Sequence, residues 1–181
     1  VCIHATNVSS HQAGLQCLVI GDGTIGVLTA WVLRQKGCEV RLLGKHYQNM
    51  EFAQELGIET SDQGSTNERY DSVFETVGRT QPSTLDLALR SVRPGGRVTV
   101  LGVYTSDFVY SLVARQLFIK ETELKGSNGY RPEEFTEAVR LIAARPTAFT
   151  GLISHRFTLV NADAAIQTAR KKYDFTMKIV F

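Results

Sequence analysis

Short apolar runs alternate with stretches of helical apolar spacing along most of the chain. Residues 17–20 form an apolar run that is too short for a helix, whereas residues 24–35 carry a helical apolar pattern. The alternation continues, predicting strands at residues 17–20, 39–43, 58–60, 70–78, 97–103 and 122–127, and helices at residues 24–35, 48–56, 83–92, 112–119 and 132–144. Because such strands are joined by right-handed crossovers, the pattern predicts an α/β fold with a doubly wound, parallel, six-stranded sheet.

The pattern changes after Arg145 and Pro146. Residues 149–157 are predicted to be extended, residues 162–171 helical, and residues 177–181 a last strand. At the other end, residues 1–7 have the pattern of a helix end, and the chain opens on Val1 rather than Met. We therefore expect this sequence to be a piece of a longer protein.

The first strand leads into a glycine-rich turn and then into the first helix. Gly21 would allow the tight turn, Gly23 would let the backbone approach a pyrophosphate, and Gly26 would let the helix pack closely on the strand. The helix N-terminus at Thr24 and Ile25 would present N–H groups and a partial positive charge to the phosphates. The turn predicts a dinucleotide-binding site of the Rossmann type, with a purely structural glycine turn as the alternative.

The composition narrows the classes of protein that the chain can belong to. A length of 181 residues with 43% hydrophobic content suits one domain with a substantial core. The formal net charge of +2 gives no reason to expect nucleic acid or a membrane as a partner, and the sequence has no apolar run of transmembrane length. Cys2, Cys17 and Cys38 are odd in number and widely spaced, so we interpret them as reduced packing residues in a cytoplasmic protein.

The order of these segments resembles the medium-chain dehydrogenase/reductase superfamily, in particular its zinc-type alcohol, polyol and threonine dehydrogenases. The resemblance covers nearly the whole chain and rests on residues 17–26, 51–57, 70–78, 93–102 and 177–181. In that family the cofactor domain is inserted into a catalytic domain. The resemblance therefore divides the chain into the end of a linking helix at residues 1–8, a dinucleotide-binding Rossmann domain at residues 9–148 and a C-terminal return of the catalytic domain at residues 149–181.

The resemblance implies an oxidoreductase that transfers a hydride between NADP(H) or NAD(H) and an alcohol, aldehyde or ketone. The N-terminal catalytic half of the family is missing, and so are its zinc-ligand segments, since the sequence has no Gly-His-Glu run and no cysteine cluster. The four histidines, His4, His11, His46 and His155, are scattered. We expect no catalytic or metal-binding residue here, no activity from this piece alone, and any zinc on the missing half.

The residues at the end of the second predicted strand indicate which nicotinamide cofactor the site prefers. A classical NAD site has an acidic residue there, about 20 residues after the glycine turn, to bind the ribose hydroxyls. This sequence has Gly44, which would leave room for a 2′-phosphate, followed by Lys45 and His46, which could pair with it. We therefore predict a preference for NADP(H), with Lys45 as the main contact, assisted by His46 and Arg41. The alternatives are NAD and a basic strand end that is merely solvated.

The resemblance places further residues near the nicotinamide half of the cofactor. These stand at or just after the ends of the predicted strands at 70–78, 97–103 and 122–127, or in the last strand: Thr76, Val77, Gly78, Gly102, Val103, Ser127, Asn128 and Lys178. Ligands of parallel sheets do lie at the carboxyl ends of strands. For Gly102 and Gly126 an ordinary strand-end turn is a competing interpretation, and for Trp31 we expect a packing role.

Two other classes of protein share parts of this pattern. An S-adenosylmethionine-dependent methyltransferase also has a glycine-rich first loop, although it wants an acidic residue where Gly44 stands and ends in a reversed hairpin. A non-catalytic nucleotide-sensing module would bind cofactor without turnover. We also expect a homo-oligomer, a dimer by resemblance, joined along the edge strand at residues 122–127.

Overall fold

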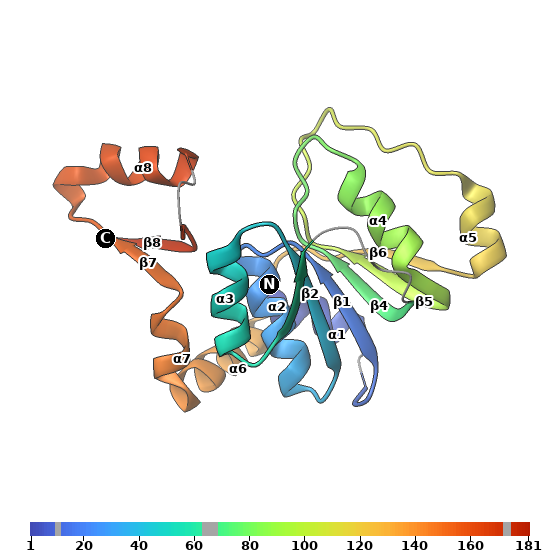
Figure 1. Cartoon of the computed structure of the whole chain (residues 1–181), viewed down its shortest axis with the longest axis horizontal. Helices are drawn as coiled ribbons and strands as arrows, with labels where there is room; N and C mark the ends of the chain where they lie inside the picture. The colour runs from blue at the N-terminus through green and yellow to red at the C-terminus, as the bar shows by residue number, and fades with distance from the viewer. Residues whose placement is uncertain (10–11, 63–68, 172–174) are drawn as a thin grey trace.

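The computed structural model of the chain describes residues 1–9, 12–62, 69–171 and 175–181. Its centre is a sheet of six parallel strands in the order β3-β2-β1-β4-β5-β6 (Figure 1). The strands are β1 (Gln16–Ile20), β2 (Glu39–Gly44), β3 (Glu59–Asp62), β4 (Tyr70–Glu75), β5 (Val92–Val100) and β6 (Glu123–Gly126). The predicted doubly wound α/β sheet is confirmed. The strand order changes direction between β1 and β4, which is the switch point where such sheets bind ligands.

Helices cover both faces of the sheet. They are α1 (Cys2–Val8), α2 (Thr24–Gln35), α3 (Tyr47–Glu55), α4 (Ser83–Ser91), α5 (Ala114–Lys120) and α6 (Pro132–Ala144). Alternate residues of β1 serve the two faces, since Cys17 and Val19 pack with α1, α2 and α3, whereas Leu18 and Ile20 pack with α4. Each large aliphatic side chain that is fully buried in these layers contributes about 1.5–3 kcal/mol.

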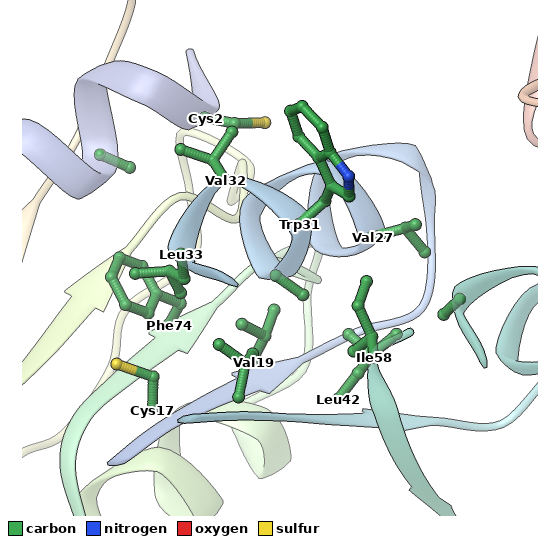
Figure 2. Close-up of a cluster of buried hydrophobic side chains, with 14 of the residues drawn as sticks. Cys2, Cys17, Val19, Val27, Trp31, Val32, Leu33, Leu42, Ile58 and Phe74 are labelled. Carbon is green, nitrogen blue, oxygen red and sulfur yellow. The ribbon is translucent and has the colours of Figure 1, made fainter. Parts of the chain in front are cut away.

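The first face is built around α2. Leu33 lies beside Phe74 on the side of α2 that faces the sheet, whereas Trp31 points away from the sheet (Figure 2). Trp31 is 3% exposed and meets the ring of Phe149 edge to face at 4.9 Å. The tryptophan is therefore a packing residue.

The fifth strand begins earlier than predicted. Val92 pairs with Tyr70 and Arg97 with Ser72, so five steps along β5 match two along β4. Residues 93–96, which lie between the predicted helix at 83–92 and the predicted strand at 97–103, form a bulge inside β5. In this bulge Gly95 has a φ of +71° and Arg93 forms an ion pair with Asp71 at 2.5 Å. The strand also ends at Val100, so Gly102 and Val103 lie in the following loop.

The C-terminal part lies beside the sheet and α8 lies apart from it (Figure 1). It contains α7 (Pro146–Thr150), β7 (Ile153–Arg156), a short 3-10 helix (Leu159–Asn161), α8 (Ala162–Lys171) and β8 (Lys178–Val180). Residues 149–150, predicted to be extended, belong instead to α7. Leu152 and Met177 are buried in the α2 face, and Phe175 packs on Phe52 of α3 at 5.9 Å. This C-terminal part therefore docks against α2 and α3.

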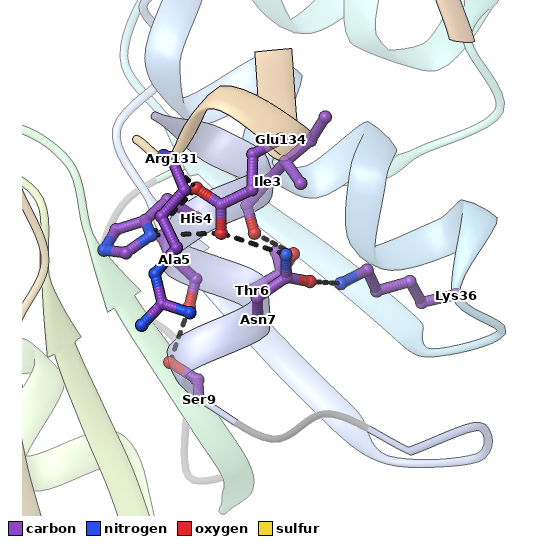
Figure 3. A network of polar contacts seen from close by, with 9 residues as sticks. All are labelled: Ile3, His4, Ala5, Thr6, Asn7, Ser9, Lys36, Arg131 and Glu134. Atoms are coloured by element: carbon purple, nitrogen blue, oxygen red, sulfur yellow. Dashed lines mark hydrogen bonds and ion pairs between the residues drawn. The ribbon is translucent and has the colours of Figure 1, made fainter. Parts of the chain in front are cut away.

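A buried carboxylate joins α1 to α6 (Figure 3). Glu134, 6% exposed, accepts hydrogen bonds from the backbone N–H of Arg131 at 2.7 Å and the side chain of Asn7 at 3.1 Å, and lies 3.0 Å from Nδ1 of His4. Burial acts to raise the pKa of Glu134, but these donors outweigh it and the pKa is lowered.

Within the described residues, no helix is both long enough and apolar enough to cross a bilayer.

Candidate functional site

A cleft of about 570 Å³ opens at the carboxyl ends of β1, β2 and β4, at the switch point of the sheet. It brings together seven of the predicted site residues: Gly21, Gly23, Gly44, Lys45, His46, Thr76 and Val77. These residues come from three loops that are well separated in sequence. The parallel sheet therefore assembles much of the predicted site in one place.

The glycine turn at the floor of the cleft has little room for side chains. Gly21 has a φ of +114°, and a Cβ there would lie 2.6 Å from Oγ1 of Thr76. A Cβ on Gly26 would lie 1.7 Å from the carbonyl oxygen of Gly21, so only glycine allows α2 to approach the turn this closely. A Cβ on Gly23 would meet nothing within 4 Å, which leaves the turn open at that point.

The N-terminus of α2 is the candidate anion-binding group. Gly23 is its N-cap and no side chain makes a capping hydrogen bond there. The first-turn N–H groups thus carry the partial positive charge of the helix end without a competing carboxylate. Thr24 and Ile25 do not line the cleft with their side chains, because the Thr24 hydroxyl donates to the carbonyl oxygen of Met177 at 2.6 Å and Ile25 packs against the core.

The reason for the glycine at the end of β2 differs from the one expected. A Cβ on Gly44 would lie 2.6 Å from both Cβ and Oδ2 of Asp22, so the space beside Gly44 is filled by that aspartate. Gly44 therefore does not itself leave room for a phosphate, although it lines the cleft. Asp22 is an acidic residue that lines the cleft beside the end of β2 and was not among the predicted site residues.

Arg41 is not part of this cleft, which corrects its predicted role in phosphate binding. It lies in mid-strand, pairs with Glu59 of β3 at 2.5 Å and hydrogen bonds to the hydroxyl of Tyr70. These residues line a separate depression toward the amino ends of the strands. Two of the three predicted basic contacts, Lys45 and His46, remain at the cleft.

The loop after β4 forms the opposite wall and is held by a buried carboxylate. Oε1 of Glu75, a residue that is 0% exposed, accepts from the N–H groups of Val77 at 2.8 Å and Gly78 at 2.9 Å and from the hydroxyl of Thr84 at 2.8 Å. Burial, with the nearby charge of Glu75, raises the pKa of Tyr104 to about 12. Arg79, the residue after Gly78, lines the cleft and has a φ of +73°. This backbone conformation costs a non-glycine residue of order 1–3 kcal/mol.

The other residues predicted for the nicotinamide half do not line this cleft. Gly78 and Gly102 pack against each other, since a Cβ on Gly102 would lie 2.3 Å from the Gly78 nitrogen. Val103 is exposed, and Ser127 donates its N–H to the Val100 carbonyl at 2.9 Å. Asn128 and Lys178 are exposed, the latter as the first residue of β8. Their predicted contacts with the nicotinamide half remain predictions.

Several lining residues were not anticipated from the sequence. They are polar or charged: Asp22, Asn49, Arg79, Gln81, Ser83, Thr84 and Thr176. Asp22 stands inside the glycine motif and Arg79 directly follows a strand end, so both positions offered a signal. Thr176 offered none, because only the docking of the C-terminal return brings it to the cleft.

The described residues do not fit a metal site. Across residues 1–9, 12–62, 69–171 and 175–181, no three His, Cys, Asp or Glu side chains are grouped so that they could hold a metal ion. His11 lies outside those residues. The cleft does suit a dinucleotide, since it combines a glycine cradle with the basic residues Lys45, His46 and Arg79.

Comparisons with known proteins agree with this geometry. A family model described as zinc-binding dehydrogenase matches residues 24–144. The 2-dehydro-3-deoxy-L-galactonate 5-dehydrogenase of Pseudoalteromonas atlantica is 30% identical over 155 residues, covering 80% of this chain and 44% of the relative. Rat sorbitol dehydrogenase is 26% identical over 182 residues, covering 93% of this chain and 50% of the relative. The chain thus spans about half the length of these curated relatives.

Solved structures show the same fold. A zinc-binding dehydrogenase from Sinorhizobium meliloti, bound to NADP, superposes with a TM-score of 0.87 at 24% identity, covering 99% of this chain and 56% of that one. The 2R,3R-butanediol dehydrogenase of Bacillus subtilis gives a TM-score of 0.85 at 22% identity, with coverage of 99% and 54%. The family match and the parallel sheet exclude the methyltransferase alternative. The chain belongs to the zinc-binding dehydrogenase family, within the medium-chain dehydrogenase/reductase superfamily, and matches its cofactor-binding part.

Proposed function

We propose that the cleft binds a nicotinamide dinucleotide, NADP(H) in preference to NAD(H), and that the protein is an oxidoreductase acting on an alcohol, aldehyde or ketone. The observation that carries this proposal is the cleft at the switch point, where an uncapped helix N-terminus and three basic residues surround open space. A polyphosphate ligand matches both features. The relatives are named as dehydrogenases of sugar acids and polyols, and one structural neighbour was solved with NADP.

Each end of the ligand would meet different groups of this chain. The pyrophosphate would lie over Gly23 and the first N–H groups of α2. The adenosine 2′-phosphate would lie beside Lys45, with His46 next to it. Gly102, Val103, Ser127 and Lys178 stay our candidates for the nicotinamide half. The bound cofactor supplies or accepts the hydride.

The substrate and any zinc ion belong, in this proposal, to residues other than those described. A non-catalytic nucleotide-sensing module is the alternative, and it would bind cofactor with no turnover in the full-length protein. The three cysteines are free and buried, which suits a reducing, cytoplasmic compartment.

We also propose that the protein forms a homo-oligomer through the edge strand β6. Leu124 on this strand is exposed, and the strand pairs only with β5 among the described residues, so its other edge is available. Sedimentation at micromolar concentration should show a dimer or larger assembly. A monomer at that concentration would contradict this part of the proposal.

Calorimetric titration with NADPH and NADH tests the cofactor assignment. We expect NADPH to bind at least about tenfold more tightly, and Lys45→Ala to weaken NADPH about tenfold while changing NADH less than about twofold, because a charge-assisted bond to phosphate contributes roughly 1.5–3 kcal/mol. Lys171→Ala, which removes an exposed lysine on α8, is the matched control and should change neither affinity. If NADH binds as tightly as NADPH or more tightly, and Lys45→Ala changes neither affinity, the NADP preference is rejected.

A further inference from the structure

The glycine turn after β1 places the carboxylate of Asp22 beside the end of β2, although β2 itself ends in Gly44. Asp22 lies between Gly21 and Gly23 and is 5% exposed. Its Oδ2 sits 2.6 Å from the place that a Cβ on Gly44 would take. The two positions are far apart in sequence, yet Asp22 fits only because position 44 has no side chain.

The carboxylate of Asp22 contacts backbone N–H groups and a side chain of the turn between β2 and α3. Oδ2 accepts from the N–H groups of Lys45 at 2.7 Å and His46 at 2.6 Å, and Oδ1 lies 2.9 Å from Nδ1 of His46. His46 is the N-cap of α3 and makes no side-chain capping bond of its own. Asp22 therefore holds the backbone just before α3 from a different loop, and both of its oxygens are already engaged.

The turn that Asp22 holds carries the basic groups of the cleft. The side chains of Lys45 and His46 are exposed and line the cleft, and Lys45 has no ion-pair partner among the described residues. The imidazole of His46 is already engaged by the Asp22 carboxylate through Nδ1. The net positive charge at this end of the cleft then comes from Lys45, with Arg79 on the opposite wall.

We propose that Asp22 is a positioning residue that sets the selectivity for the adenosine 2′-phosphate. By fixing the backbone at residues 45 and 46, it orients Lys45 and His46 toward the ligand, and its pairing with His46 keeps its own charge from repelling the phosphate. This inference rests on the proposed function, because it concerns the adenosine end of the same cleft.

Two half-cofactor ligands separate this role from cofactor binding in general. We would titrate the full-length protein with adenosine 2′,5′-bisphosphate and with adenosine 5′-monophosphate, which differ only in the 2′-phosphate. Asp22→Ala should weaken the bisphosphate about tenfold and the monophosphate less than about twofold, as expected for the loss of an oriented charge-assisted contact. Asp22→Asn, which keeps one acceptor oxygen, should fall between wild type and Asp22→Ala.

Two further variants complete the experiment. His46→Gln tests the same pair if Asp22→Ala does not fold, and it should also lower the ratio of the two affinities. Asp163→Asn removes an exposed aspartate on α8 and is the matched control, with no expected change.

Each possible outcome either supports or overturns this role. An equal loss for both ligands would mean that Asp22 is only structural, and tighter bisphosphate binding in Asp22→Asn would mean that its charge opposes the phosphate; either result overturns the inference while leaving the proposed function intact. If the wild-type protein binds neither ligand, nor NADPH or NADH, the proposed function fails and this role fails with it.

Discussion

The two ends of the sheet both carry basic side chains, but they use them differently. Toward the amino ends of the strands, Arg41 pairs with Glu59, Arg93 with Asp71 and Arg97 with Glu123. At the carboxyl ends, Lys45 and Arg79 line an open cleft and form no ion pair with a described residue. Pairs between neighbouring strands neutralise the first set, whereas the second set is left to attract an anion. We therefore expect unpaired charges beside open space, and not the number of basic residues, to mark the end of the sheet that binds the cofactor.

The largest effect should come from filling the glycine cradle at the carboxyl end. Gly26→Val would place atoms against the Gly21 carbonyl, which a Cβ alone would approach to 1.7 Å. We expect a loss of at least about 1–3 kcal/mol in the free energy of unfolding, as for other overpacked sites, together with loss of NADPH binding. Urea unfolding and calorimetry measure the two effects. Gly126→Ala, at a glycine without a left-handed φ where a Cβ would meet nothing within 4 Å, provides the comparison. A stable Gly26→Val variant that binds NADPH normally would contradict the assigned role of this glycine.

The second largest effect should come from replacing Glu75, the buried carboxylate that holds the loop after β4. Glu75→Ala leaves the N–H groups of Val77 and Gly78 and the Thr84 hydroxyl without their acceptor. Leaving a buried donor without a partner costs about 1–3 kcal/mol, so we expect destabilisation of at least about 3 kcal/mol and weaker cofactor binding. Glu75→Gln keeps one acceptor oxygen and should lose less. Equal stability of the two variants and wild type, measured by urea unfolding, would show that Glu75 does not hold this loop.

The contact between α1 and α6 predicts a pH dependence that is independent of the cleft. The pKa of Glu134 is lowered in the fold, so the ionised group stabilises the protein at pH values above its ordinary pKa of 4.5. This contribution is lost as the pH falls through the lowered pKa. Unfolding free energies of wild type and Glu134→Gln should therefore converge as the pH is lowered from neutral. A difference between them that stays constant with pH would contradict the ion-pair role.

The smallest effect is expected at the amino ends of the strands. Arg41→Ala removes an ion pair whose Glu59 partner is largely exposed, and such pairs contribute about 0–1 kcal/mol. NADPH affinity should not change, because Arg41 lies outside the cleft. A tenfold loss of NADPH affinity in Arg41→Ala would remove the distinction between the two ends of the sheet.

The sequence was sufficient for the sheet because apolar periodicity and glycine punctuation are local signals. Each of the six predicted strands is present, and the glycine turn lies where the first strand meets α2. The bulge at residues 93–96 was missed, since a strand that continues through Pro94 and two glycines depends on its pairing with β4.

The site was predictable only in part, because side-chain direction is a tertiary property. Gly44 stands where a classical NAD site has an acidic residue, so the sequence indicates that no carboxylate is present there. In the structure, however, Asp22 of the neighbouring loop fills the space beside Gly44. Arg41 and Lys45 look equivalent in the sequence, but only Lys45 follows the strand end and lines the cleft. Thr176 reaches the cleft from the far C-terminal segment of the chain, and no local pattern encodes that approach.

A crystal structure of the protein grown with NADPH tests the central claim most directly. We predict density for the dinucleotide in the cleft between β1, β2 and β4, with the pyrophosphate over Gly23 and the 2′-phosphate beside Lys45. An empty cleft at saturating NADPH, or cofactor bound at the amino ends of the strands near Arg41, would contradict that claim.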